Sequence, residues 1–270
     1  MEKCNKIASQ KYKYWIKIIN VMKNKILLSA VVISFLVFYQ VESVKAQFVL
    51  DIESGIVSTG YNDVRIPGDL GMRFSLKDDL NPMTEIYYRL RAGYTIKSRH
   101  TLSILYAPLE IKSDGQIPND VSFAGTVFPA NTKLGAIYKF NSYRFTYRYD
   151  FIKRKNFDFG LGFTAKIRDA RIALVSTQST AAKDDLGFVP IINFRMAWRC
   201  TNTFGLLIDG DALAAKQGRA EDVQIAATCK ISNNLGFRVG YRILEGGADN
   251  SEVYSFALFH YASAGLSITF

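Results

Sequence analysis

The chain has 270 residues, with 34 Lys and Arg against 24 Asp and Glu, and a formal net charge of +10 at pH 7. Residues 1–46 hold eight of the basic residues and two of the acidic ones, which leaves 26 against 22 in residues 47–270, a net charge of about +4. Because most of the positive charge lies in the N-terminal segment, the composition argues against nucleic-acid binding.

The N-terminal segment has the pattern of a secretory signal peptide. Residues 22–46 start with a basic stretch, continue with an apolar run from Ile26 to Phe38, and end in a small-residue cleavage site at Ala46. The run is shorter than the roughly 20 residues that a spanning helix needs. We expect a leader over 1–46 and one domain over 47–270; the alternative is an uncleaved N-terminal anchor.

After the leader, strict alternation of apolar and polar residues predicts β-strands. Around the stretch GLGFTAKIRDARIAL at residues 160–174, one face carries Phe157, Phe159, Leu161, Phe163, Ala165 and Ile167, and the other carries Asp158, Gly160, Gly162, Thr164, Lys166 and Arg168. Residues 84–97, 143–151, 235–244 and 254–270 repeat the pattern. The apolar face is rich in aromatic side chains, and the opposite face is charged.

This distribution favours a membrane barrel over a soluble β-sandwich. A sandwich would have to fit all the aromatic side chains into one thin core. In a transmembrane barrel the apolar face meets lipid, aromatic side chains gather near the two interfaces, and the interior is polar. Closure of the barrel also pairs the backbone groups that lipid would leave unsatisfied. We therefore predict an all-β, antiparallel, up-and-down transmembrane barrel.

The spacing of the patterned segments predicts ten strands. Long and short connections alternate, which places both termini in the periplasm because periplasmic turns are short. Two further segments, 69–76 and 121–128, would raise the number to twelve, and the merging of weak strands would lower it to eight. The ten expected spans are 48–60, 84–97, 101–114, 132–152, 156–176, 186–199, 203–213, 220–231, 235–244 and 254–270.

At the level of architecture, the chain resembles small bacterial outer-membrane β-barrel proteins. The resemblance rests on the leader that ends in Lys-Ala-Gln, on the alternating strands, and on the terminal Phe270 preceded by apolar residues at every second position. It implies a location in the bacterial outer membrane, contact with outer-membrane lipid and lipopolysaccharide, and recognition of Phe270 by the barrel-assembly machinery. We expect a monomer without nucleic acid and without a cofactor.

The charged face is expected to line the lumen, where Arg and Lys would pair with Asp and Glu because unpaired buried charges are costly. The side chains expected to point inward are Glu85, Arg89, Arg91, Lys139, Arg144, Arg148, Asp150, Asp158, Lys166, Arg168, Asn193, Arg195, Asp209, Asp211, Gln224, Arg238 and Arg242. An open lumen lined by these cations would instead favour anions.

Three dense charged segments, 166–171, 209–222 and 241–252, are expected to reach one extracellular rim. Their carboxylates are hard donors of the kind that calcium prefers, but they lack the spacing of a calcium loop, so ion pairing is the simpler explanation and we expect no metal. The candidate rim cluster is Arg168, Asp169, Arg171, Asp209, Asp211, Arg219, Glu221, Asp222, Arg242, Glu245 and Glu252.

Two classes of function follow. The first is a non-enzymatic barrel with a structural or envelope role, or a narrow pore. The second is a lipid-modifying hydrolase, similar to lipid A deacylases or phospholipases, with His260 as the weak candidate base; such an enzyme needs a nucleophile beside a base. Counting back from Phe270 turns His260 toward lipid, which favours the first class. Cys200 and Cys229 are expected to stay unpaired because they lie on separated strands.

Overall fold

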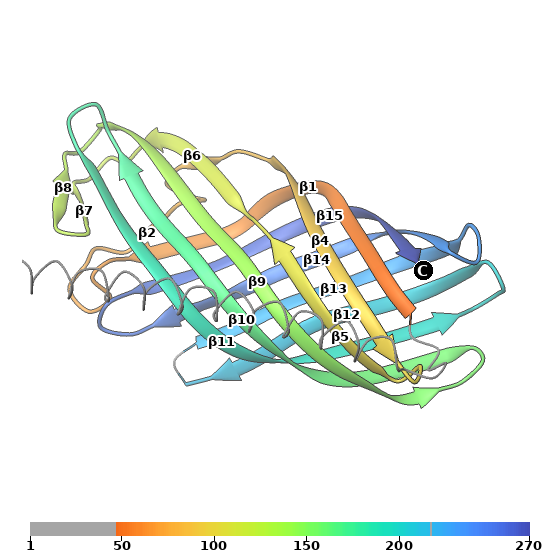
Figure 1. The fold of residues 1–270 in the computed structure, drawn as a ribbon. Coiled ribbons are helices and arrows are strands. Elements are labelled where there is room, and N and C mark those ends of the chain that lie inside the picture. The colour runs from red at the N-terminus through yellow and green to blue at the C-terminus, as the bar shows by residue number, and fades with distance from the viewer. Residues whose placement is uncertain (1–46, 217) are drawn as a thin grey trace, which may run out of the picture. The chain divides into compact units, whose positions relative to one another are not determined.

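The computed structural model describes residues 47–216 and 218–270. The expected leader, residues 1–46, lies outside the described residues. Regular structure within the described ranges is β-strand throughout (Figure 1). The described part contains no helix with the length and apolar character needed to cross a membrane.

Ten strand positions close into an antiparallel barrel, which confirms the predicted fold class and strand number. Each position pairs with its neighbours in chain order, and β1 closes the ring by pairing with β15 as well as β4. The bounds are β1 Gln47–Arg65, β4 Glu85–Ile96, β5 His100–Ala107 with β6 Glu110–Gln116, β9 Lys133–Lys153, β10 Phe157–Val175, β11 Thr180–Arg199, β12 Phe204–Ala215, β13 Gly218–Lys230, β14 Leu235–Asp249 and β15 Tyr254–Thr269.

Strands β5 and β6 share one position because both pair with β9. Pro108 separates them. Proline has no backbone N–H to donate to the neighbouring strand, so the ladder is interrupted where it occurs.

The two segments that would have given twelve strands do not enter the barrel ring. Residues 69–76 contribute only β2 (Phe74–Ser75), and residues 121–128 form the hairpin of β7 (Val121–Phe123) and β8 (Thr126–Phe128). With β3 (Asn81–Pro82), they cover the end of the barrel opposite Gln47 and Phe270 (Figure 1). Their apolar side chains build a core there rather than facing lipid: Phe74, Leu76, Leu80, Val121, Phe123 and Phe128 are all buried.

The connections at this far end are shorter than the expected 177–185, 214–219 and 245–253. Pairing continues to Val175↔Thr180, Ala215↔Gly218 and Asp249↔Tyr254. The apolar alternation ends earlier than the strands because it is imposed only where one face meets lipid. Strand pairing continues without it, so the pattern underestimates strand length at this end.

The apolar faces point outward, as predicted. Ile86 is 82% exposed and Phe163 is 52% exposed, and the aromatic row of β9 includes the exposed Tyr143, Phe145 and Tyr147. Lys139 contradicts its expected inward position: it lies on the outward face of β9 and pairs with Asp169 of β10 at 2.8 Å. The register of β9 places its even-numbered residues inside, among them the buried Ser142 and Arg144.

A bulge in β1 changes which residues face the interior. The pairing with β15 shifts between Thr59 and Tyr61. Glu53 and Val57 are buried before the bulge, and Asn62 and Val64 after it. Gly60 occupies the bulge, where an added Cβ would lie 2.5 Å from Nε2 of His260. The extra residue changes which side chains of β1 point inward. The apolar side chain of Val64 therefore packs into the core at the far end.

Candidate functional site

Six charged side chains meet in the middle of the lumen. They come from six of the ten strand positions and are each at most 5% exposed. Three are cations and three are anions, so the group is electrically balanced. We call it the central cluster, and its members are Glu53 of β1, Arg89 of β4, Arg144 of β9, Asp211 of β12, Asp222 of β13 and Arg242 of β14.

Asp222 is the hub of the central cluster. Its carboxylate accepts hydrogen bonds from Arg89 at 2.9 Å, from Arg144 at 2.5 Å and from Arg242 at 2.5 Å. Arg144 also donates to Asp211 at 2.6 Å. These contacts link β4, β9, β12, β13 and β14 across the lumen, and each is a short, charge-assisted hydrogen bond of the stronger kind.

Glu53 is the second hub. Arg242 donates to both of its oxygens, at 2.9 and 3.0 Å, and Arg238 donates at 2.8 Å. Tyr87 Oη and the Gln224 amide supply further donors, at 3.1 and 3.0 Å. A buried carboxylate is tolerated only when it is paired and hydrogen-bonded, and Glu53 meets both conditions.

Neutral side chains complete the central cluster around Asp211. Thr164 donates to it at 2.7 Å and Asn193 at 3.0 Å. Thr164 also contacts Thr146 at 2.8 Å. These contacts come from β9, β10 and β11. The polar network therefore includes β10 and β11, which supply no charged side chain to the central cluster.

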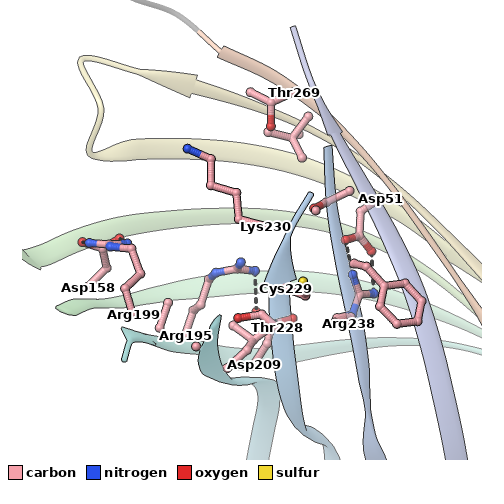
Figure 2. A pocket seen from close by; sticks show the side chains of 18 of the residues that line it. Asp51, Asp158, Arg195, Arg199, Asp209, Thr228, Cys229, Lys230, Arg238 and Thr269 are labelled. Carbon is pink, nitrogen blue, oxygen red and sulfur yellow. Dashed lines mark hydrogen bonds and ion pairs between the residues drawn. The ribbon is translucent and has the colours of Figure 1, made fainter. Parts of the chain in front are cut away.

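Between the central cluster and the end of the barrel that holds Gln47 and Thr269 lies a cavity of about 700 Å3, which we call the terminal-side cavity (Figure 2). Nine basic side chains line it against five acidic ones. Asp209 pairs with Arg91 at 2.9 Å and with Arg195 at 3.6 Å, and Arg199 pairs with Asp158 at 2.7 Å. Figure 2 shows Arg195 beside Asp209 and Arg199 beside Asp158 on the cavity wall, with Lys230 reaching in from β13. The excess of cations makes this space attractive to anions.

A second cavity, of about 460 Å3, lies on the other side of the central cluster; we call it the far-side cavity. It shares no lining residue with the terminal-side cavity. Most of its wall is apolar, including Tyr138, Phe140, Ile172, Leu244 and Phe259. The lumen is therefore divided into two spaces of different character, with the central cluster between them.

The structure separates the residues of the expected rim cluster. Asp209, Asp211, Asp222 and Arg242 lie deep in the lumen instead of at a rim. Asp169 and Glu221 lie on the outward sides of their strands. Arg219 and Glu245 also face outward, where they pair with each other at 2.7 Å and contact Tyr61 beyond the bulge. Alternation assigns a face, but the height of a residue in the barrel depends on strand stagger.

The remaining expected lumen residues have mixed outcomes. Arg148 pairs with Asp150 at 3.1 Å. Arg168 pairs with Asp185 of β11, a carboxylate that is not among the side chains expected to point inward. Lys166 is buried, but the described residues place no carboxylate within ion-pair distance of it; its ammonium lies 4.6 Å from the centre of the Phe140 ring.

Sequence reasoning missed Glu53 and Asp51, although a signal was present. Asp51 and Glu53 alternate with Leu50 and Ile52, the same pattern that identified the other strands. Asp51 pairs with Arg238, which also contacts Glu53. Both carboxylates lie at the start of the first strand, close to the expected leader. For this reason they were not predicted as lumen residues.

At the far end, Lys183 of β11 donates a hydrogen bond to Glu252 in the β14–β15 turn at 2.9 Å. Both side chains are exposed. The hydrogen bond from the Lys183 ammonium lowers the pKa of Glu252 below its ordinary value. This contact joins two strands that are not neighbours in the barrel, and it crosses the barrel mouth above the far-side cavity, which Lys183 also lines.

His260 faces away from the lumen. It lies on the outward side of β15 opposite Ser58, and its ring Nδ1 is hydrogen-bonded to Tyr241 of β14. The described residues bring no carboxylate into hydrogen-bond contact with it. His100 lies beside the β4–β5 turn, where it contacts Tyr147 at 2.9 Å. Among the described residues, neither histidine is hydrogen-bonded to an orienting carboxylate of the kind that a nucleophile–base pair uses in hydrolysis.

The carboxylates considered for calcium are engaged by cations and amides. Asp209 faces Arg91, whereas Asp211 and Asp222 belong to the central cluster. Within residues 47–216 and 218–270, no group of three or more His, Cys, Asp or Glu side chains is arranged to hold a metal ion. Cys200 and Cys229 are both free.

Comparison with known proteins finds no matching family model and no matching curated protein. Similar solved structures include the outer membrane protease OmpT of Escherichia coli, at 12% identity and a TM-score of 0.49 over 83% of this chain and 97% of that chain. The COG4313 outer membrane channel of Pseudomonas putida F1 has 10% identity and a TM-score of 0.40, over 86% of this chain and 98% of that chain. Neisserial surface protein A has 14% identity and a TM-score of 0.34, over 83% of this chain and 99% of that chain. The closed pairing of the strands and the apolar outer face of the barrel are the basis for assigning this chain to the outer-membrane type of barrel.

Proposed function

We propose that the protein is a plugged barrel of the bacterial outer membrane with a structural or surface role, and that it is not an open pore. The central cluster carries this proposal, because its six buried side chains reach across the lumen between two cavities that share no wall. Outer-membrane lipid and lipopolysaccharide would surround the apolar exterior, and the barrel-assembly machinery would insert the chain.

Conductance in a planar bilayer tests the plug. The wild-type protein is expected to show no steady current steps, because an ion would have to break several charge-assisted hydrogen bonds of the central cluster to pass. The double variant Arg144→Ala/Asp222→Ala removes one charge of each sign, so the remaining four stay balanced. We expect this variant to conduct, since two large side chains no longer fill the middle of the lumen.

The matched control is Lys139→Ala/Asp169→Ala, which removes an ion pair of the same type from the outward face. It is expected to be as silent as the wild type. Reproducible ion-selective steps from the wild-type protein would contradict the plug and would favour the narrow-pore alternative. The lipid-hydrolase alternative has no supporting contact around His260 in the described part of the chain.

A further inference from the structure

The barrel wall is interrupted beside the far-side cavity. Strands β11 and β12 pair only from Ile192↔Ala212 to Arg199↔Gly205. Residues 180–191 of β11 continue as a strand paired with β10 alone, while β12 continues to Ala215 paired with β13. In Figure 1 the far ends of β10 and β11 diverge from the β12–β13 hairpin. The described residues thus leave an opening in the ring at this level.

Pro190 is placed where the two strands part. It pairs with Ala165 of β10 on one side, and it has no backbone N–H to offer to a strand on the other. Proline occurs in sheets mainly on edges for this reason. The sequence of β11 therefore specifies an edge at the position where the strand separates from β12.

The far-side cavity extends through this opening. Its lining includes Lys166, Tyr138 and Phe259 from the interior, and also Phe188 and Pro190, whose side chains are on the outer surface of β11. On the outer surface of β11 beside the opening, Phe188 is 66% exposed and Leu186 is 75% exposed, and the charged Asp184 lies farther along the same face. A molecule dissolved in the membrane therefore has a lateral route into this cavity.

An interruption between β1 and β4 is filled, which shows that the opening at β11 is not a general feature of this end. The pairing of β4 with β1 ends at Val57↔Glu85, and the space beyond it is occupied by the core built on Phe74, Phe123 and Phe128. No segment of the described chain covers the cavity at β11 and β12 in the same way.

Lys166 is the buried cation of the far-side cavity that has no carboxylate partner. It is 3% exposed, and no carboxylate of the described residues pairs with it. Arg144, directly opposite on β9, is already engaged by Asp211 and Asp222. Arg168, the next inward residue of β10, pairs with Asp185, and its Nε is buried without a partner among the described residues. The other cations of the lining are each paired with a carboxylate: Arg171 with Asp184, Lys183 with Glu252, and Arg219 with Glu245. An ammonium and a guanidinium N–H are thus available in a mainly apolar space.

We propose that the far-side cavity binds a single-chain anionic amphiphile that enters from the membrane between β11 and β12. Its apolar chain would lie along Tyr138, Phe259 and Leu244, and its head group would pair with the Lys166 ammonium. The volume of about 460 Å3 lies within the range of small-molecule sites, roughly 300–1,000 Å3. The central cluster closes the cavity below, so the amphiphile is retained and does not cross to the terminal-side cavity.

Native mass spectrometry in dodecyl maltoside tests this site, with oleate as the anionic probe and methyl oleate as its neutral counterpart. The wild type is expected to bind one oleate. Lys166→Met keeps most of the side-chain volume and removes the charge, so it should weaken oleate binding about tenfold or more, the ratio expected for one charge-assisted hydrogen bond. Binding of methyl oleate should be unchanged. Lys139→Met, on the outward face, serves as the matched control.

A second variant, Ala220→Trp, places a large side chain in the cavity from β13 and should reduce binding of both probes. It tests the site independently if Lys166→Met does not fold. Displacement of oleate by lysophosphatidate would identify a phosphate head group derived from membrane lipid, and its failure would identify a free carboxylate. No stoichiometric oleate binding to the wild type, or folded Lys166→Met with wild-type affinity for oleate, would overturn the proposal.

Discussion

Asp222→Asn is expected to lower the free energy of unfolding by about 3–5 kcal/mol, the range observed when one partner of a buried ion pair is removed. Asparagine keeps the shape of the side chain but leaves Arg89, Arg144 and Arg242 with two carboxylates among them in place of three. The surplus cation cannot reach water from a cluster that is at most 5% exposed. Urea unfolding in lipid vesicles, followed by the loss of the compact gel band, measures the change.

The matched control is Glu252→Gln, which neutralises a carboxylate in the exposed pair with Lys183. It should unfold at the wild-type urea concentration, because exposed ion pairs contribute little to stability. If Asp222→Asn were as stable as this control, the central cluster would have to be hydrated and the lumen open to water. The same result would weaken the proposal that the barrel is plugged.

Leu161→Arg is expected to destabilise the inserted barrel by roughly 2–4 kcal/mol, the cost of a cation near the bilayer midplane on the lipid face. Leu161 points outward from β10, and the apolar face of this strand runs from Phe157 to Ile167. Unfolding by urea from vesicles gives the stability, and the yield of folded protein gives the efficiency of insertion.

Val175→Arg provides the comparison on the same face of the same strand. It lies beyond Asp169 and Arg171, at the end of β10 and outside the apolar stretch. Its effect is expected to be about 0–1 kcal/mol, as found for charges near the interface. Equal effects at Leu161 and Val175 would mean that the outward apolar face does not meet lipid as proposed.

The alternation of residues predicted most of the architecture of residues 47–270. It assigned the outward faces of β4, β9, β10, β14 and β15 correctly apart from Lys139 of β9, and it predicted ten strands. It failed where the physical cause of alternation ends. Beyond the lipid, both faces of a strand meet water or a packed core, so the pattern placed Thr180 in a loop although it pairs with Val175 in the β10–β11 hairpin.

The central cluster could be predicted only in part. Period-two alternation identifies Arg144, Asp211 and Arg242 as inward because each lies between apolar neighbours. It does not specify partners: Arg144 and Asp222 are 78 residues apart in the chain, and Arg89 and Asp222 are 133 apart. The tilt and stagger of the strands determine which inward residues share a level. For this reason the sequence predicts Asp222 at a rim. Glu53 was missed for a different reason, because it lies next to the expected leader.

The alternation of residues along each strand predicts which face is apolar, because a strand with one side in lipid alternates at every second residue, and it predicts closure, because lipid cannot satisfy an open sheet edge. The use of the interior depends on the assembled barrel. Ring closure brought three cations and three anions from six strands to one level, folded two apolar loop segments into a core at the far end, and left β11 unpaired with β12 beyond Ile192. Such contacts depend on register around a closed ring, which no single strand encodes.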